Sequence, residues 1–151
     1  MKIFTDLARF SAHAGHSLGE TDYLTITQEM VNLFAEATGD HQWIHTNPAR
    51  AEQESPFKAP IAHGFLTLSL APKFMAQLYR IDSVRMGINY GANKIRFTNV
   101  VPVGSRLRMR ATLKTVEPQD KGLRVTMECT FELEHSPKPA CVAELITLLF
   151  E

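Results

Sequence analysis

The spacing of apolar residues changes near Arg85 in this 151-residue chain. Before that point apolar positions recur every three or four residues, as in helices, and after it every second residue, as in strands. The clearest alternation lies in 106–134, where two runs flank the turn-like segment Glu117–Gly122. Helices followed by a succession of strands predict an α+β fold in which an antiparallel sheet wraps a long buried helix.

The two alternating runs carry opposite charges on their polar faces. The basic residues are Arg106, Arg108, Arg110 and Lys114, and the acidic ones are Glu128, Glu132 and Glu134. A basic row alone could bind a polyanion, but acidic residues of matching parity on the next strand can pair with it. Because 16 Lys+Arg balance 16 Asp+Glu, the chain also has no net charge to attract nucleic acid. We expect a solvated sheet face and no nucleic-acid partner.

Two further strand runs flank this hairpin. Between Met86 and Phe97 the apolar residues change parity near Gly91 to Lys94, which a β-bulge would explain. The last run, Ala140–Phe150, is nearly all apolar and predicts a strand covered on both faces. A single sheet around one helix leaves strand edges open, so we expect a homodimer or larger homo-oligomer whose sheet continues across subunits.

Helices are expected before the strands. One runs from about Thr27 to Thr38; Thr25 or Thr27 can cap its start, and Gly39 is its left-handed stop. A short one begins at Asn47-Pro48, a capping residue followed by proline at the first helical position. The longest covers Ile61–Tyr79, is apolar on most sides, and should bend or break near Pro72.

The chain length fits one domain over residues 1–151. Lys73 and Gln77 lie inside the longest apolar stretch and argue against a membrane span. Asp6 and Arg9 interrupt the N-terminal apolar residues before a signal-peptide core could form. We therefore expect a cytoplasmic protein with no membrane partner.

The candidate functional residues are Asp40, His45 and Gly64. Asp40 should lie just past a helix end, with His45 five residues further in a connecting loop. A carboxylate (pKa ~3.9) and an imidazole (pKa ~6.5) can share one water, one group taking a proton while the other delivers one. Spacing alone is weak support, because a loop aspartate often only caps a turn. Gly64 falls near the start of the longest helix, where an unpaired amide can stabilise a substrate oxygen that becomes negative, although a glycine there can also serve packing alone.

A metal site is an alternative for the same stretch. The plausible ligands are Asp40, His41, His45 and His63. Nothing in the sequence places His41 and His45 on one face, because they precede the helix start at Asn47. We therefore expect no metal.

At these positions the chain resembles the MaoC-like (hydratase-2) family of hotdog-fold proteins, and within it the NodN-like branch. The family pattern runs from a serine or threonine and Gly-Asp, through a histidine five beyond the aspartate, to a small residue six beyond that histidine. The matching residues are Thr38, Gly39, Asp40, His45 and Ala51. Pro60–Leu66 resembles the family's helix-opening motif, and the order of helices and strands agrees over nearly the whole chain.

The resemblance implies a hotdog fold and the addition of water to a trans-2-enoyl thioester of coenzyme A or acyl-carrier protein. The product is the (3R)-hydroxyacyl thioester, and the reaction is reversible. Asp40 and His45 would share the water, the Gly64 amide would hold the thioester oxygen, and no cofactor is needed. Three positions depart from the family pattern: Gln42-Trp43 replaces Asn-Pro, and Pro72 stands where the family has a serine.

Two other functions stay open from the sequence. A hotdog thioesterase could use a carboxylate and an oxyanion donor to hydrolyse the same thioester. A non-catalytic acyl-thioester binding domain would keep its ligand after loss of Asp40 and His45. Hydration of crotonyl-CoA is distinguished by loss of the enoyl absorbance without release of free thiol.

Overall fold

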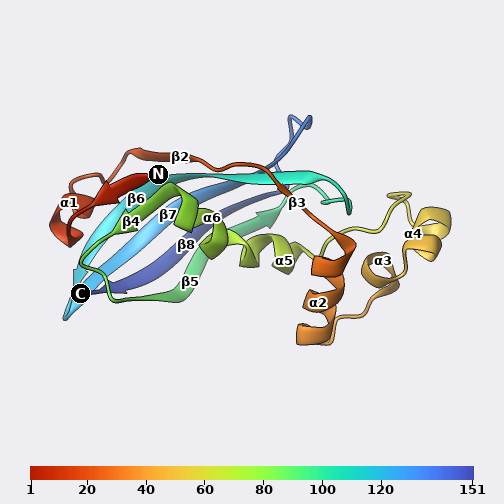
Figure 1. Ribbon diagram of the computed structural model, residues 1–151, viewed down its shortest axis with the longest axis horizontal. Helices are drawn as coiled ribbons and strands as arrows, with labels where there is room; N and C mark the ends of the chain where they lie inside the picture. Colours follow the sequence, from red (N-terminus) through yellow and green to blue (C-terminus); the bar gives the residue numbers. More distant parts are fainter.

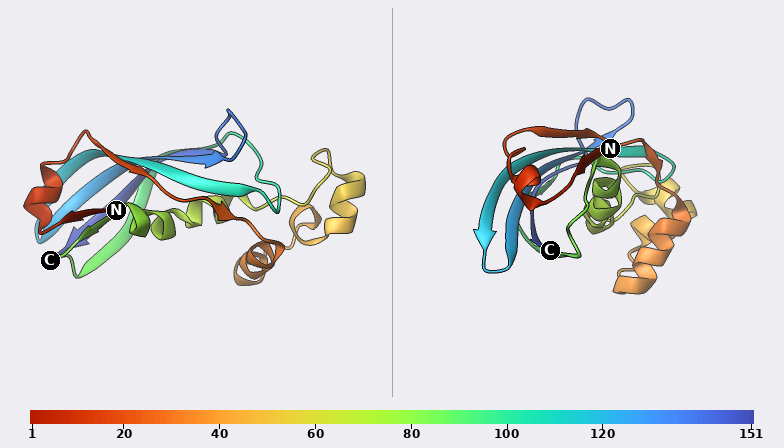
Figure 2. Two further views of the ribbon diagram at one scale, coloured as in Figure 1. Left: turned by 45° about the horizontal axis from the view of Figure 1, so that its top comes forward. Right: turned by 60° about the vertical axis from the view of Figure 1, so that its left-hand side comes forward.

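An antiparallel six-stranded sheet forms the body of the protein in the computed structural model, which describes residues 1–151. Its strands are β2 (Ser17–Glu20), β3 (Leu24–Thr25), β5 (Met86–Phe97), β6 (Arg106–Gln119), β7 (Gly122–Leu133) and β8 (Cys141–Phe150). The order is β2-β6-β7-β8-β5, and β3 also pairs with β6. The sheet curves around α5 (Gly64–Ser69) and α6 (Ala71–Leu78) (Figures 1 and 2). This arrangement confirms the α+β hotdog fold.

The remaining elements lie at the two ends of the sheet. One end carries α1 (Leu7–Ser11) and a parallel pair formed by β1 (Lys2–Phe4) and β4 (Tyr79–Ile81). The other end carries α2 (Gln28–Thr38), α3 (Trp43–Thr46) and α4 (Pro48–Glu54), which we call the α2–α4 cluster (Figure 1). None of the helices combines the length and apolarity needed to cross a membrane.

The predicted hairpin is β6 and β7, and its charged faces pair as expected. The ion pairs are Arg106–Glu134 (3.1 Å), Arg108–Glu132 (2.9 Å), Arg110–Glu132 (2.8 Å) and Lys114–Glu128 (3.1 Å). The turn is shorter than the predicted Glu117–Gly122, because β6 continues to Gln119 and only Asp120 and Lys121 lie between the strands. The opposite face of the hairpin is buried in a cluster of 26 core residues that includes residues of α5 and α6.

The predicted helix over Ile61–Tyr79 begins three residues later, at Gly64, and the predicted break near Pro72 is confirmed. The segment forms two helices, α5 and α6, which meet at Leu70. Pro72 lies in the first turn of α6, where its missing N–H leaves no helical hydrogen bond unmade, so the break falls just before it. The two helices are also buried on one side only, and not on most sides as predicted, since Phe65 is 64% exposed in the single chain while Phe74 is fully buried.

The two strands that flank the hairpin in the sequence, β5 and β8, differ in how well they agree with the predictions. β5 shows two register shifts against β8, at 89–91 and 92–94, which confirms the predicted bulge. β8 lies between β7 and β5 and none of its residues is exposed, but one of its faces is mostly half-buried in the single chain, so the predicted cover on both faces is met only in part. β5 forms an open edge of the sheet and exposes Met86, Ile88 and Tyr90.

Candidate active site

Asp40 lies just past the end of α2, after Gly39, as the capping signals predicted. The Thr27 hydroxyl caps the start of α2 by accepting the Met30 N–H (3.2 Å), and Gly39 ends the helix at φ 79°. The Asp40 side chain is 52% exposed. Its Oδ1 accepts the Gln42 N–H in a long hydrogen bond of 3.4 Å, the turn-capping role that aspartate often has in loops.

His45 does not lie in a loop, as the sequence suggested, but in the one-turn helix α3. It is only 6% exposed, and its Nδ1 lies 2.6 Å from the Ile61 carbonyl oxygen. Because a carbonyl oxygen can only accept, Nδ1 carries the hydrogen, and the neutral ring has its lone pair at Nε2. Burial lowers the pKa of His45, and the hydrogen bond to Ile61 raises it. Of the two nearby titratable groups, His63 lowers this pKa and Asp40 raises it. A neutral imidazole with a free Nε2 can accept a proton.

Gly64 is the first residue of α5 and His63 is its N-cap, as predicted. The Gly64 N–H donates no hydrogen bond within the chain. A Cβ built on Gly64 would lie 3.1 Å from the ring of Phe97, at the end of β5. The glycine therefore does serve packing, against Phe97, and it also leaves an amide available to a ligand.

His63 joins Asp40 and His45 in one cluster, in which both histidines are buried and which sequence reasoning had considered only as a metal site. One ligand atom from each of the three lies within 4.8 Å of the other two. His41 does not take part, since its ring is half exposed with Nδ1 3.8 Å from Glu36. The only sequence signal for His63 was its place in the helix-opening motif directly before Gly64.

The geometry of the cluster fits a metal ion poorly. The rings of His45 and His63 are stacked, with centroids 3.9 Å apart and an interplanar angle of 26°. A ring nitrogen's lone pair lies in the ring plane, so nearly parallel rings do not direct two lone pairs at a common point. Each ring also has one nitrogen engaged by a backbone carbonyl oxygen, Ile61 O for His45 and Asp40 O for His63.

A cavity of about 540 Å³ opens beside His45 and Gly64, a size typical of small-molecule sites. It is lined by residues that include His45, Phe57, Gly64, Thr67, Phe97 and Asn99. Trp43, which departs from the family pattern, does not line it, and the Arg50 guanidinium lies 4.4 Å from the Trp43 ring. The change to Trp43 therefore affects the surface of α3 and α4 rather than the cavity wall.

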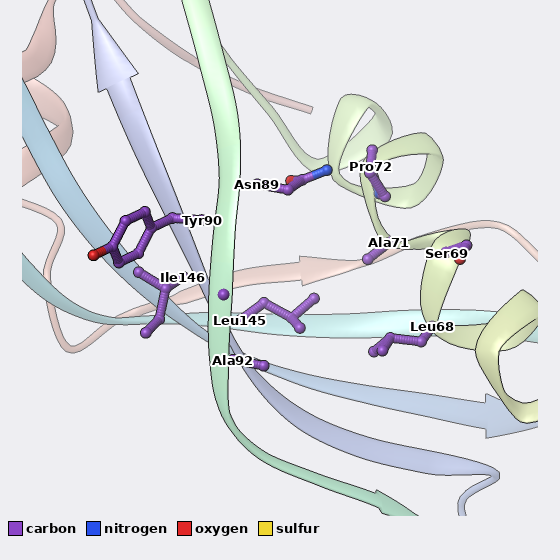
Figure 3. Close-up of a pocket in the computed structure, with 10 residues that line it drawn as sticks. Leu68, Ser69, Ala71, Pro72, Asn89, Tyr90, Ala92, Leu145 and Ile146 are labelled. Atoms are coloured by element: carbon purple, nitrogen blue, oxygen red, sulfur yellow. The ribbon is translucent and has the colours of Figure 1, made fainter.

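A second cavity, of about 430 Å³, lies between β5 and the α5–α6 helices (Figure 3). Its lining includes Leu68, Ser69, Pro72, Asn89, Ala92 and Leu145. Pro72, which stands where the family has a serine, lines this cavity and not the one beside His45. The lost hydroxyl therefore leaves the grouping of Asp40, His45 and Gly64 unchanged.

Known proteins resemble this chain in both sequence and fold. The MaoC like domain family matches residues 9–133. The 3-hydroxyacyl-thioester dehydratase Z of Mycobacterium tuberculosis is 52% identical over 147 residues, 97% of each chain. Nodulation protein N of Rhizobium leguminosarum bv. viciae is 41% identical and covers 95% of this chain and 90% of its own. R-hydratase PhaJ1 of Pseudomonas aeruginosa superposes with a TM-score of 0.77 at 25% identity, over 98% of this chain and 87% of its own. The chain belongs to the MaoC-like dehydratase family.

Proposed function

We propose that the protein is a hydro-lyase that adds water across a trans-2-enoyl thioester to give the (3R)-hydroxyacyl thioester, and catalyses the reverse. The observation that carries this proposal is a buried imidazole with an unengaged Nε2, next to a carboxylate and facing the cavity that Gly64 also lines. The name of the 52% identical relative, a 3-hydroxyacyl-thioester dehydratase, supports the same chemistry. The substrate is carried by coenzyme A or acyl-carrier protein, and no cofactor takes part.

Asp40, His45 and Gly64 divide the work of this reaction. Asp40 and His45 hold the water between them, and one of them takes a proton from it as its oxygen bonds to C3 of the enoyl group. The pair then returns a proton to C2, so that one water is added in total. Negative charge that gathers on the thioester oxygen is stabilised by the Gly64 N–H. Because α5 has only six residues, this single amide matters more than the helix dipole.

The assembly we propose is a homodimer or larger, built from copies of one MaoC-like domain in the cytoplasm. β5 supports it, because this strand is an unpaired edge that exposes Met86, Ile88 and Tyr90. Antiparallel pairing of β5 with β5 of a second copy would give both of these open strand edges a hydrogen-bonded partner. The exposed Phe65 of α5 would gain cover from a neighbouring copy.

Turnover of crotonyl-CoA tests the proposed reaction. Hydration removes the enoyl absorbance while the thioester stays intact, and 3-hydroxybutyryl-CoA forms with the (3R) configuration. Enoyl-CoA esters of graded chain length then define the preferred acyl group. Release of free thiol in step with loss of absorbance would instead indicate a thioesterase. Tight binding without turnover at any chain length would indicate a binding domain.

A further inference from the structure

His63 lies where three parts of the site meet: the end of α2, helix α3 and the start of α5. We infer that His63 is a positioning residue, which holds the backbone of Asp40 by a hydrogen bond and the ring of His45 by stacking. This inference rests on the proposed function, since it assigns His63 a task in the same reaction. His63 itself is only 3% exposed and does not line the cavity beside His45, so it acts through its neighbours.

The first contact is with Asp40. The His63 Nε2 lies 2.9 Å from the Asp40 carbonyl oxygen and 3.9 Å from the carboxylate Oδ2. Because the carbonyl can only accept, Nε2 is the donor. The Asp40 side chain is half exposed, and its own hydrogen bond to the Gln42 N–H is long at 3.4 Å. The bond from His63 is therefore the shortest of the hydrogen bonds that hold Asp40, since the Asp40 N–H also lies 3.4 Å from the Thr38 hydroxyl.

The second contact is with His45. One hydrogen bond, from Nδ1 to Ile61 O, holds one edge of the His45 ring. Stacking on His63, with centroids 3.9 Å apart, fixes the plane of the ring and hence the direction of the Nε2 lone pair. His63 is itself held by Phe34 of α2, whose ring centroid is 4.9 Å away. A misplacement of about 1 Å in such a group can lower a rate by about 10²-fold.

The side chain of His63 also carries an unpaired buried atom. Its Nδ1 is buried and has no hydrogen-bond partner. Leaving a buried polar atom unpaired is unfavourable, so a residue kept for packing alone would be better replaced by a carbon ring. Donation to Asp40 and stacking on His45 need both a flat ring and an N–H. Histidine provides both at this size, and the unpaired Nδ1 is the consequence.

Two variants separate the contacts. His63→Gln keeps an amide N–H near the position of Nε2 but has no ring, whereas His63→Phe keeps a ring but has no donor. We expect kcat for crotonyl-CoA to fall roughly 10- to 100-fold in each, with KM changed far less, because ground-state binding uses other residues. His41→Gln, a nearby exposed histidine, is the matched control and should leave kcat unchanged.

A pH titration adds a direct measurement of the contact between the two histidines. The titratable groups that act on His45 are His63, which lowers its pKa, and Asp40, which raises it. Removing the imidazole in His63→Gln should therefore raise the pKa of His45 and move the acid limb of kcat/KM to higher pH. NMR titration of the His45 ring in the resting protein measures the same shift without turnover.

The outcomes separate this inference from the proposed function. If both His63 variants fold, as judged by circular dichroism, and keep the wild-type kcat and His45 titration, the positioning role is wrong. If only one variant folds, its kcat and its His45 titration alone decide whether His63 has the positioning role. If the wild type hydrates no enoyl-CoA while His63→Gln still shifts the His45 titration, the proposed function fails and the contact between the two histidines stands.

Discussion

Asp40 and His45 are held in opposite ways, and this difference decides how they should be tested. Asp40 is half exposed, whereas His45 is buried with its Nδ1 hydrogen bonded to Ile61. A carboxylate at the surface can be changed to an amide with little effect on folding. A substitution of His45 must keep a donor for the Ile61 carbonyl, and asparagine, whose amide nitrogen replaces Nδ1, does so.

Asp40→Asn and His45→Asn should each lower kcat for crotonyl-CoA by roughly 10²–10⁴-fold, the usual contribution of an acid–base group. If the two groups act on one water, the double variant should be little worse than either single variant, because residues that act as a unit are not additive. Steady-state kinetics and thermal unfolding provide the measurements. Near-normal turnover by either folded single variant would exclude the assignment, and loss of wild-type activity with a chelator would favour a metal.

Gly64→Pro should remove the candidate oxyanion donor, since proline is tolerated at the first helical position but has no N–H. Loss of one such donor typically lowers kcat by ~10²–10³-fold. Gly64→Ala keeps the N–H, but its Cβ would crowd the Phe97 ring at 3.1 Å. The comparison is therefore best made in a Phe97→Ala background, which removes the ring atoms that this Cβ would meet.

In that background the alanine protein should retain markedly more activity than the proline protein. Circular dichroism of both proteins controls for folding. Equal kcat in the two would show that the Gly64 amide does not hold the thioester oxygen, and would leave contact with Phe97 as the reason for the glycine.

Residue roles could be predicted where the signal was local. Asp40 and Gly64 were placed correctly because a helix stop and a helix start are encoded within a few residues of each. His63 was grouped with Asp40 only as a candidate metal ligand, and its hydrogen bond to the Asp40 backbone could not be predicted because the two are 23 residues apart in the sequence and meet only through the fold.

Helices were likewise predicted where residues close in the sequence define them, and missed where a distant contact holds them. α2 and α4 begin where Thr27 and Asn47 cap them, and both starts were predicted from capping residues. α3 has no side-chain cap at Gln42 and was missed. It is held instead by a distant contact, a hydrogen bond of 3.0 Å from the Ile61 N–H to the Ile44 carbonyl oxygen.

The hairpin of β6 and β7 has a constraint that alternation does not reveal. A Cβ on Gly122, the first residue of β7, would overlap the backbone carbonyl oxygen of Leu149 on β8. Such close backbone approach is a known reason for glycine in a strand. The position looks like an ordinary turn glycine in the sequence.

Gly122→Ala should therefore destabilise the protein by at least about 1–3 kcal/mol, because a strand backbone cannot move aside as a side chain can. Lys121→Ala, an exposed neighbour in the same turn, is the control and should change the free energy of unfolding by less than about 0.5 kcal/mol. Urea unfolding measures both. A Gly122→Ala protein as stable as the control would mean that β7 and β8 separate at this end at little cost.

For the whole molecule, the main open question is the β5 edge, which has no partner strand within a single chain. Light scattering at micromolar concentration should give at least twice the 17.0 kDa mass of the chain. Ile88→Lys places a charge on that edge and should shift the protein toward the monomer. Leu33→Lys, an equally drastic change at an exposed apolar residue of α2, should not. A 17.0 kDa wild-type particle would contradict the proposed assembly.

The chemistry is divided between two parts of the molecule. Asp40 and His45 belong to the α2–α4 cluster, whereas Gly64 begins the helix that the sheet encloses (Figure 1). Ile61 lies directly between them, donating its N–H to Ile44 and accepting the His45 Nδ1–H. The Ile61 amide should therefore exchange with deuterium only when the cluster undocks. Its exchange rate would report how long the acid–base pair and the amide donor stay aligned, before any substrate is added.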